Sequence, residues 1–165
     1  MKSTTLAVLL CIAPLAVQAA DVPISGNVQT RCLIMTDTNG VFGNPVPSKL
    51  STAAADGGVV PVVRYDVTLA DSYVAKISTP TSFSTSPVLS DSVAWVGATT
   101  VTQTTDAGMS IYETNKSTYG STTEFDLTIA GSTWFSSSAS ADYGYNKSFP
   151  GGSYSAIIVA ECIAK

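Results

Sequence analysis

The chain ends in the stretch PGGSYSAIIVAECIAK, residues 150–165, and this stretch decides how the rest is interpreted. Its first three residues are a turn signal. An alternation with period two follows, which predicts a strand. One face of that strand is made of Tyr154, Ala156, Ile158, Ala160 and Cys162. Because Ile157, Val159 and Ile163 make the other face apolar too, we expect a strand inside a sheet or one that a partner covers.

The same alternation recurs along the chain. The clearest run places Val63, Tyr65 and Val67 on one face and charged or polar residues on the other. Similar runs cover residues 22–34, 73–77, 93–101 and 125–129. We count seven or eight short strands between turns rich in Gly, Pro, Asn and Ser, and no convincing helix. This spacing predicts an all-β fold, an antiparallel β-sandwich.

Three local predictions follow from the same patterns. Residues 61–78 look like a hairpin that turns at Asp71 and Ser72. Met109 and Ile111 suggest a short strand. The low-complexity stretch SSSASA, residues 136–141, reads as an exposed loop.

The amino-terminal residues 1–19 have the pattern of a secretory signal peptide. A short positive start is followed by an apolar run from Leu6 to Val17 and then by small residues. We therefore expect residues 20–165 to form a single mature domain that begins at Ala20. A membrane anchor is the alternative, but the run is short for a helix that must cross about 30 Å of hydrocarbon. Cys11 raises a lipoprotein alternative, which the bulky Leu10 before it disfavours.

Net charge limits the kinds of partner that we expect, and cysteine content indicates a disulfide. Without Lys2, the mature chain has 7 basic and 12 acidic residues, a net charge of 7 − 12 = −5. There is no basic run or stripe, so we expect no nucleic-acid partner. In an oxidising compartment, the two remaining cysteines, Cys32 and Cys162, are expected to form a disulfide. Two free buried thiols are the alternative.

The sequence offers few residues that could form a catalytic site. The chain has no histidine, which excludes a Ser-His or Cys-His pair and an imidazole metal site. We therefore expect neither an enzyme nor a cofactor or metal site. Tyr143 and Tyr145 are candidate aromatic residues for stacking on a ligand such as a sugar. Packing within the protein is the alternative reading for them.

The two ends together resemble a known family. The stretches ISGNVQTRC, residues 24–32, and GGSYSAIIVA, residues 151–160, are similar to the opening and closing strands of bacterial fimbrial (pilin) subunits of the chaperone–usher type. The resemblance implies an immunoglobulin-like sandwich that lacks its last strand. It also implies an open apolar groove between the first and final strands.

The resemblance further implies how that groove is filled. A periplasmic chaperone occupies it first, and the amino-terminal segment of the next copy or of a related fimbrial subunit then replaces it at an outer-membrane usher. The donor segment would lie within residues 20–28. Its matching residues are Val22, Ile24, Gly26 and Val28. The matching groove-lining residues are Tyr154, Ala156, Ile158 and Ala160. The product would be a cell-surface fimbria, with a host-surface receptor as a further partner and a role in cell adhesion.

Two departures from the family pattern leave an alternative open. Many such subunits pair their first cysteine with one in the following strand, whereas Cys162 lies in the last. A bridge here would restrict the groove or lie beyond its end. Only about twelve mature residues precede Cys32, so the donor is short or shares residues with the first strand. The alternative is a secreted, self-complete β-sandwich adhesin or module that binds carbohydrate or protein.

Overall fold

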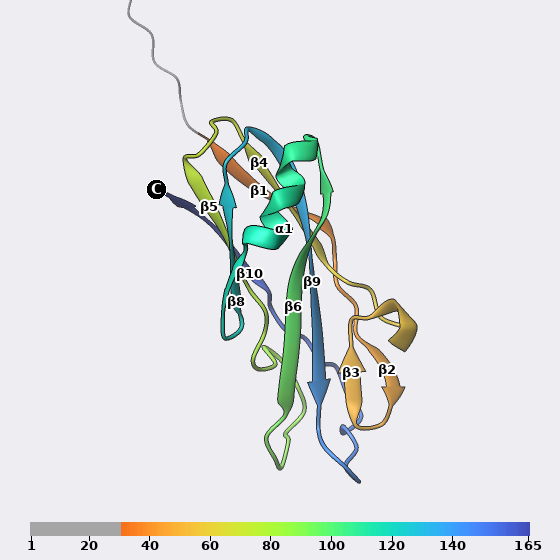
Figure 1. Ribbon diagram of the computed structural model, residues 1–165. Helices are drawn as coiled ribbons and strands as arrows, with labels where there is room; N and C mark the ends of the chain where they lie inside the picture. The colour runs from red at the N-terminus through yellow and green to blue at the C-terminus, as the bar shows by residue number, and fades with distance from the viewer. Residues whose placement is uncertain (1–30) are drawn as a thin grey trace, which may run out of the picture.

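The computed structural model describes residues 31–165, which form two antiparallel sheets packed as an all-β sandwich (Figure 1). This confirms the predicted fold class. The sheets contain ten strands rather than seven or eight, because three of them are only three or four residues long and leave little periodicity in the sequence. The predicted signal peptide and the four predicted donor residues lie outside the described residues.

Each sheet ends in a strand from one end of the described chain. The first sheet has the order β1 (Cys32–Thr38), β4 (Val62–Val67), β9 (Gly131–Asp142), β3 (Lys49–Ser51) and β2 (Gly43–Val46), and β6 (Ala94–Thr104) pairs with the other side of β9. The second has the order β10 (Val159–Ala164), β5 (Tyr73–Ser78), β8 (Thr122–Leu127) and β7 (Ser117–Tyr119). Within residues 31–165, β1 pairs only with β4 and β10 only with β5, so both are edge strands.

The predicted hairpin over residues 61–78 is wrong. β4 and β5 belong to different sheets, and the chain crosses from one sheet to the other between them. The inward side chains of both strands are apolar and are buried, except that Val63 is half-buried, as the alternation predicts. They pack against each other across the core instead of lying side by side. Asp71, with a φ of 57°, occupies the left-handed region at this crossing.

The prediction of an exposed loop at residues 136–141 is also wrong. It lies within β9, which has strand partners on both sides and runs beside β6 along much of the molecule (Figure 1). Ser137, Ala139 and Ala141 point inward and are buried. Their burial reflects the strand's central place in the sheet, which a composition of small polar residues does not indicate.

Helical turns replace the strand predicted at Met109 and Ile111. Residues Ala107–Ile111 form a 3₁₀ helix that continues into α1 (Tyr112–Asn115), and a further 3₁₀ turn covers Ala54–Asp56. The Asp106 side chain caps the start by accepting a hydrogen bond from the Gly108 N–H at 2.7 Å. Met109 and Tyr112, three residues apart, both turn into the core, as a helical period requires.

The core fills one half of the sandwich with large side chains. Phe125 and Phe135 lie with ring centroids 4.5 Å apart, and Tyr65 meets Phe135 edge-on at 5.4 Å. All three side chains are fully buried. The Tyr65 hydroxyl donates to the Glu161 carbonyl at 3.1 Å, so a residue of the first sheet is hydrogen-bonded to the edge strand of the second. Burying a phenol this deeply requires such a partner.

A disulfide joins the same two edge strands. Cys32 begins β1 and Cys162 lies near the end of β10, with their Cα atoms 6.4 Å apart. The predicted pairing is therefore confirmed. The bridge closes a loop between residues 130 positions apart, for which chain entropy gives a stabilisation of up to about 5 kcal/mol.

The buried phenol of Tyr65 should make the stability of the fold decrease at alkaline pH. Burial raises the pKa of Tyr65 well above its ordinary value of 10. Because the fold holds the neutral form, this contribution to stability is complete below about pH 10 and is lost as the pH rises further. We expect Tyr65→Phe to reduce the free energy of unfolding at pH 7 by about 1 kcal/mol and to lessen its decline above about pH 10.

Urea denaturation of both proteins at neutral and alkaline pH measures this effect. Tyr145→Phe is the matched control, since Tyr145 is 93% exposed. An alkaline decline of equal size in Tyr65→Phe and in the unaltered protein would contradict the assignment to Tyr65.

Candidate functional site

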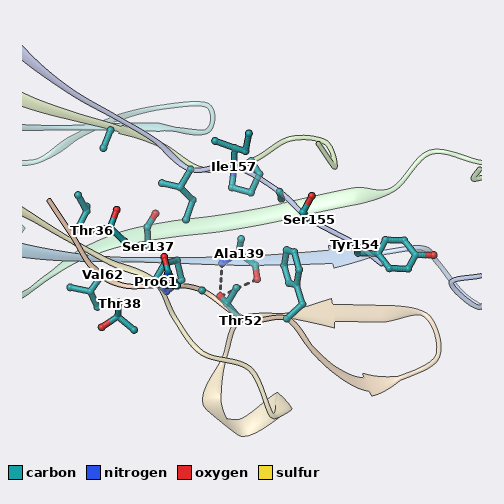
Figure 2. A pocket seen from close by; sticks show the side chains of 18 of the residues that line it. Thr36, Thr38, Thr52, Pro61, Val62, Ser137, Ala139, Tyr154, Ser155 and Ile157 are labelled. Carbon is teal, nitrogen blue, oxygen red and sulfur yellow. Dashed lines mark hydrogen bonds between the residues drawn. The ribbon is translucent and has the colours of Figure 1, made fainter. Parts of the chain in front are cut away.

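An open groove separates β1 from β10 on the side of the sandwich where each sheet has a free edge. A cavity of about 570 Å³ lies in this groove (Figure 2). The disulfide lies at one end of the groove, and Tyr154 with its aromatic neighbours lies at the other. The cavity therefore lies along the seam between the first and last strands of the described chain.

The closing stretch of the chain differs from the prediction in its pairing but not in its alternation. β10 begins at Val159 rather than at Tyr154, and before it only Ser155 forms an isolated bridge, with Thr85. β5 ends at Ser78, opposite Val159, and the chain beyond it turns toward β8. Residues 156–158 therefore have no ladder partner in the described part of the chain. Since β10 is an edge strand, an interior position in a sheet is ruled out within residues 31–165.

The structure brings all four predicted groove residues to the cavity. The side chains that line it from the last strand and the segment before it include Tyr154, Ala156, Ile158 and Ala160. They alternate with the more exposed Ser155 and Ile157, which also line the cavity; Ile157 is 64% exposed. The opposite wall comes from β1 through Ile34, Thr36 and Thr38.

The floor of the groove was not predicted. It includes Ser137 and Ala139 of β9, whose small side chains leave the space open. The polar groups here are satisfied within the protein: the Ala139 N–H donates to Thr52 Oγ1 at 2.9 Å (Figure 2). The hydroxyls of Ser137 and Thr99 are 2.9 Å apart. The sequence signal that could have indicated this strand is the period-two pattern of Ser and Ala in residues 136–141.

The lining suits an extended apolar segment better than an ion or a reacting substrate. No Asp, Glu, Lys or Arg of residues 31–165 lines the cavity, and apart from the Asn39 amide its side chains are aliphatic, aromatic or hydroxyl-bearing. The described residues contain no group of three or more His, Cys, Asp or Glu side chains placed to hold a metal ion. What the groove offers is apolar surface between two strands that have no partner on their outer edges within residues 31–165.

An aromatic cluster forms the end of the groove opposite the disulfide. The Tyr154 ring lies 5.1 Å from Phe83 and 5.3 Å from Phe149, and Tyr143 stacks on Phe149 at 5.1 Å. The Tyr154 hydroxyl donates to the Pro150 carbonyl at 2.7 Å, which holds the ring in place. The cluster thus anchors the start of the segment that borders the groove.

The two candidate ligand aromatics do not form an exposed pair. Tyr143 is only 5% exposed, and hydrogen bonds with Ser90 at 3.0 Å lower the pKa of its hydroxyl. Tyr145 is 93% exposed. The reason is the alternation of β9, which continues into Tyr143 and turns its ring inward. Packing within the protein is therefore the correct reading for Tyr143.

No protein-family model, curated protein or solved structure matches the chain. Among residues 31–165, no helix has both the length and the apolar character needed to cross a bilayer.

Neighbouring substitutions should show which face of the last segment is inward. Ile158→Thr replaces an ethyl group on the half-buried groove side with a hydroxyl, so we expect it to lower the free energy of unfolding by about 1–2 kcal/mol. Val159→Thr changes a side chain that is 48% exposed, and its effect should be within about 0.5 kcal/mol. Denaturation of the two variants in parallel makes the comparison. Equal losses would contradict the alternation described here.

Proposed function

We propose that this protein is a structural subunit of a bacterial surface fimbria, assembled by donor-strand complementation. The observation that carries the proposal is the cavity between β1 and β10, which are both edge strands among residues 31–165. In this proposal the described domain is an immunoglobulin-like sandwich without its last strand. The chain is exported through the periplasm, and its product is displayed on the cell surface.

Backbone pairing would supply the affinity. Unpaired N–H and C=O groups along an edge strand favour the addition of another strand. Residues 156–158 lack a ladder partner within the described residues, so an added strand would supply them with the most new backbone hydrogen bonds. A strand added here would also cover Ile34 and Ile158, which are only partly buried against the core.

The predicted donor segment matches the groove in length and in spacing. The groove-lining residues Tyr154 to Ala160 span seven positions, about 20 Å at about 3.3 Å per residue. The predicted donor residues, Val22 to Val28, also span seven positions with apolar or glycine residues at every second place. A single extended segment with this spacing could therefore direct alternate side chains into the groove.

The positions of the two ends favour an end-to-end arrangement. β1 begins and β10 ends beside the disulfide, so the donor segment of each copy leaves the domain at the disulfide end. The aromatic end of the groove lies at the far end. A donor running antiparallel to β10 would enter from that end, so its own domain would lie beyond the end of the acceptor. Repetition of this contact gives an open filament instead of a closed ring.

The proposal includes the partners that such assembly needs. Before polymerisation, a periplasmic chaperone would cover the groove, and an outer-membrane usher would exchange it for the donor of the next subunit. A host-surface receptor and a role in adhesion belong to the assembled fibre. In the alternative, a secreted self-complete module, the groove would be filled within the same chain and the protein would be a stable monomer.

Fibre assembly should depend on the inward residues of the donor segment. We expect Ile24→Asp to abolish assembly, because a carboxylate cannot be buried in an uncharged groove without a partner. Ser25→Asp introduces the same charge at the adjacent, outward position and should leave assembly intact. Electrophoresis of unboiled surface extracts measures this, since paired subunits should form a ladder that collapses on boiling.

The control is co-expression with the cognate chaperone and usher, with export of each variant verified by immunoblotting. A purely monomeric product from the unaltered chain under these conditions would overturn the proposed function. So would a ladder that Ile24→Asp leaves unchanged.

A further inference from the structure

The disulfide lies immediately beyond one end of the groove. The last lining residue from β10 is Ala160, and Cys162 is the next inward position along the strand. On β1, Ile34 lines the cavity and Cys32 is the preceding inward position. Neither cysteine lines the cavity itself. The bridge thus follows the lining residues directly on both walls.

The spacing at the bridge leaves no room for another strand. Neighbouring strands lie about 4.8 Å apart, so a strand inserted between β1 and β10 needs them about 9.6 Å apart. At the bridge, the Cα atoms of Cys32 and Cys162 are 6.4 Å apart and covalently tethered. An inserted strand that follows the cavity to Ala160 therefore cannot continue between the two strands beyond it.

We propose that the bridge makes the groove a slot with one closed end, which accepts the free amino-terminal end of a second copy. This inference rests on the proposed function and on removal of residues 1–19. The seated strand begins at Ala20 next to the bridge and runs antiparallel to β10. A precursor that keeps its signal peptide cannot seat in the same way, because its chain would have to pass the bridge.

The closed end also selects the register. With Ala20 opposite Ala160, Val22 lies opposite Ile158, Ile24 opposite the small Ala156, and Gly26 opposite the large Tyr154. Large and small side chains then alternate across the seam, as close packing favours. Moving the donor two residues further would pair Ile24 with Ile158 and place Ala20 level with Cys162, where no strand fits.

The test compares extensions at the two ends of one donor peptide. The acceptor is the oxidised mature chain carrying Ile24→Asp, which spoils its own donor, refolded with each peptide. The first peptide spans residues 20–30 without extension. The second carries Gly-Ser-Gly-Ser before Ala20, and the third carries the same four residues after Thr30. Competition against a labelled copy of the first peptide gives the relative affinities.

We expect the amino-terminal extension to weaken binding by at least about tenfold, because it forces the donor out of register or out of the groove. The carboxy-terminal extension lies at the open end and should leave affinity within about twofold. Replacing both cysteines, Cys32→Ser with Cys162→Ser, should reduce the penalty of the amino-terminal extension if that chain refolds. The comparison between peptides does not depend on this variant.

The outcomes separate the two proposals. Equal binding of both extended peptides would overturn the closed slot while supporting donor-strand complementation. Failure of all three peptides to bind would overturn the proposed function and the slot with it. A selective loss with the amino-terminal extension supports both.

Discussion

The free edges of β1 and β10 are the constraint on which the rest of the structure depends. Every buried backbone group needs a hydrogen-bonding partner, and the inner strands of the described chain obtain theirs within the two sheets. Within residues 31–165, β1 and β10 are paired on one side only, as β2, β6 and β7 are, but β1 and β10 also border the same groove. The disulfide holds the two strands together at one end, so they cannot separate or slide past each other there.

Side-chain size determines where the sandwich is filled and where it is hollow. Near Tyr65, Phe125 and Phe135, large rings occupy the space between the sheets. Farther along β9, Ser137 and Ala139 take the inward positions and the cavity opens. The same strand therefore supports both the core and the groove. A domain with this division is closely packed around the three rings and, farther along, has apolar surface available for a partner.

Much of this organisation could be predicted from the sequence because alternation reports which side chains share a face. It placed Tyr154, Ala156, Ile158 and Ala160 on one face, and all four line the cavity. Alternation does not report which strand is the neighbour, so β4 and β5 were mistaken for a hairpin. The small residues of β9 resemble a loop in composition, and their burial depends on strands distant in the sequence. The floor of the site was missed for that reason.

The place of the disulfide has a mechanical consequence. Arg31 is the residue just before Cys32, so a tensile load that enters the domain there meets a covalent cross-link after one residue. The load divides between β1 in one sheet and β10 in the other instead of peeling β1 from β4 one hydrogen bond at a time. Both ladders are then loaded together, which makes this end of the domain resistant to unravelling under pull.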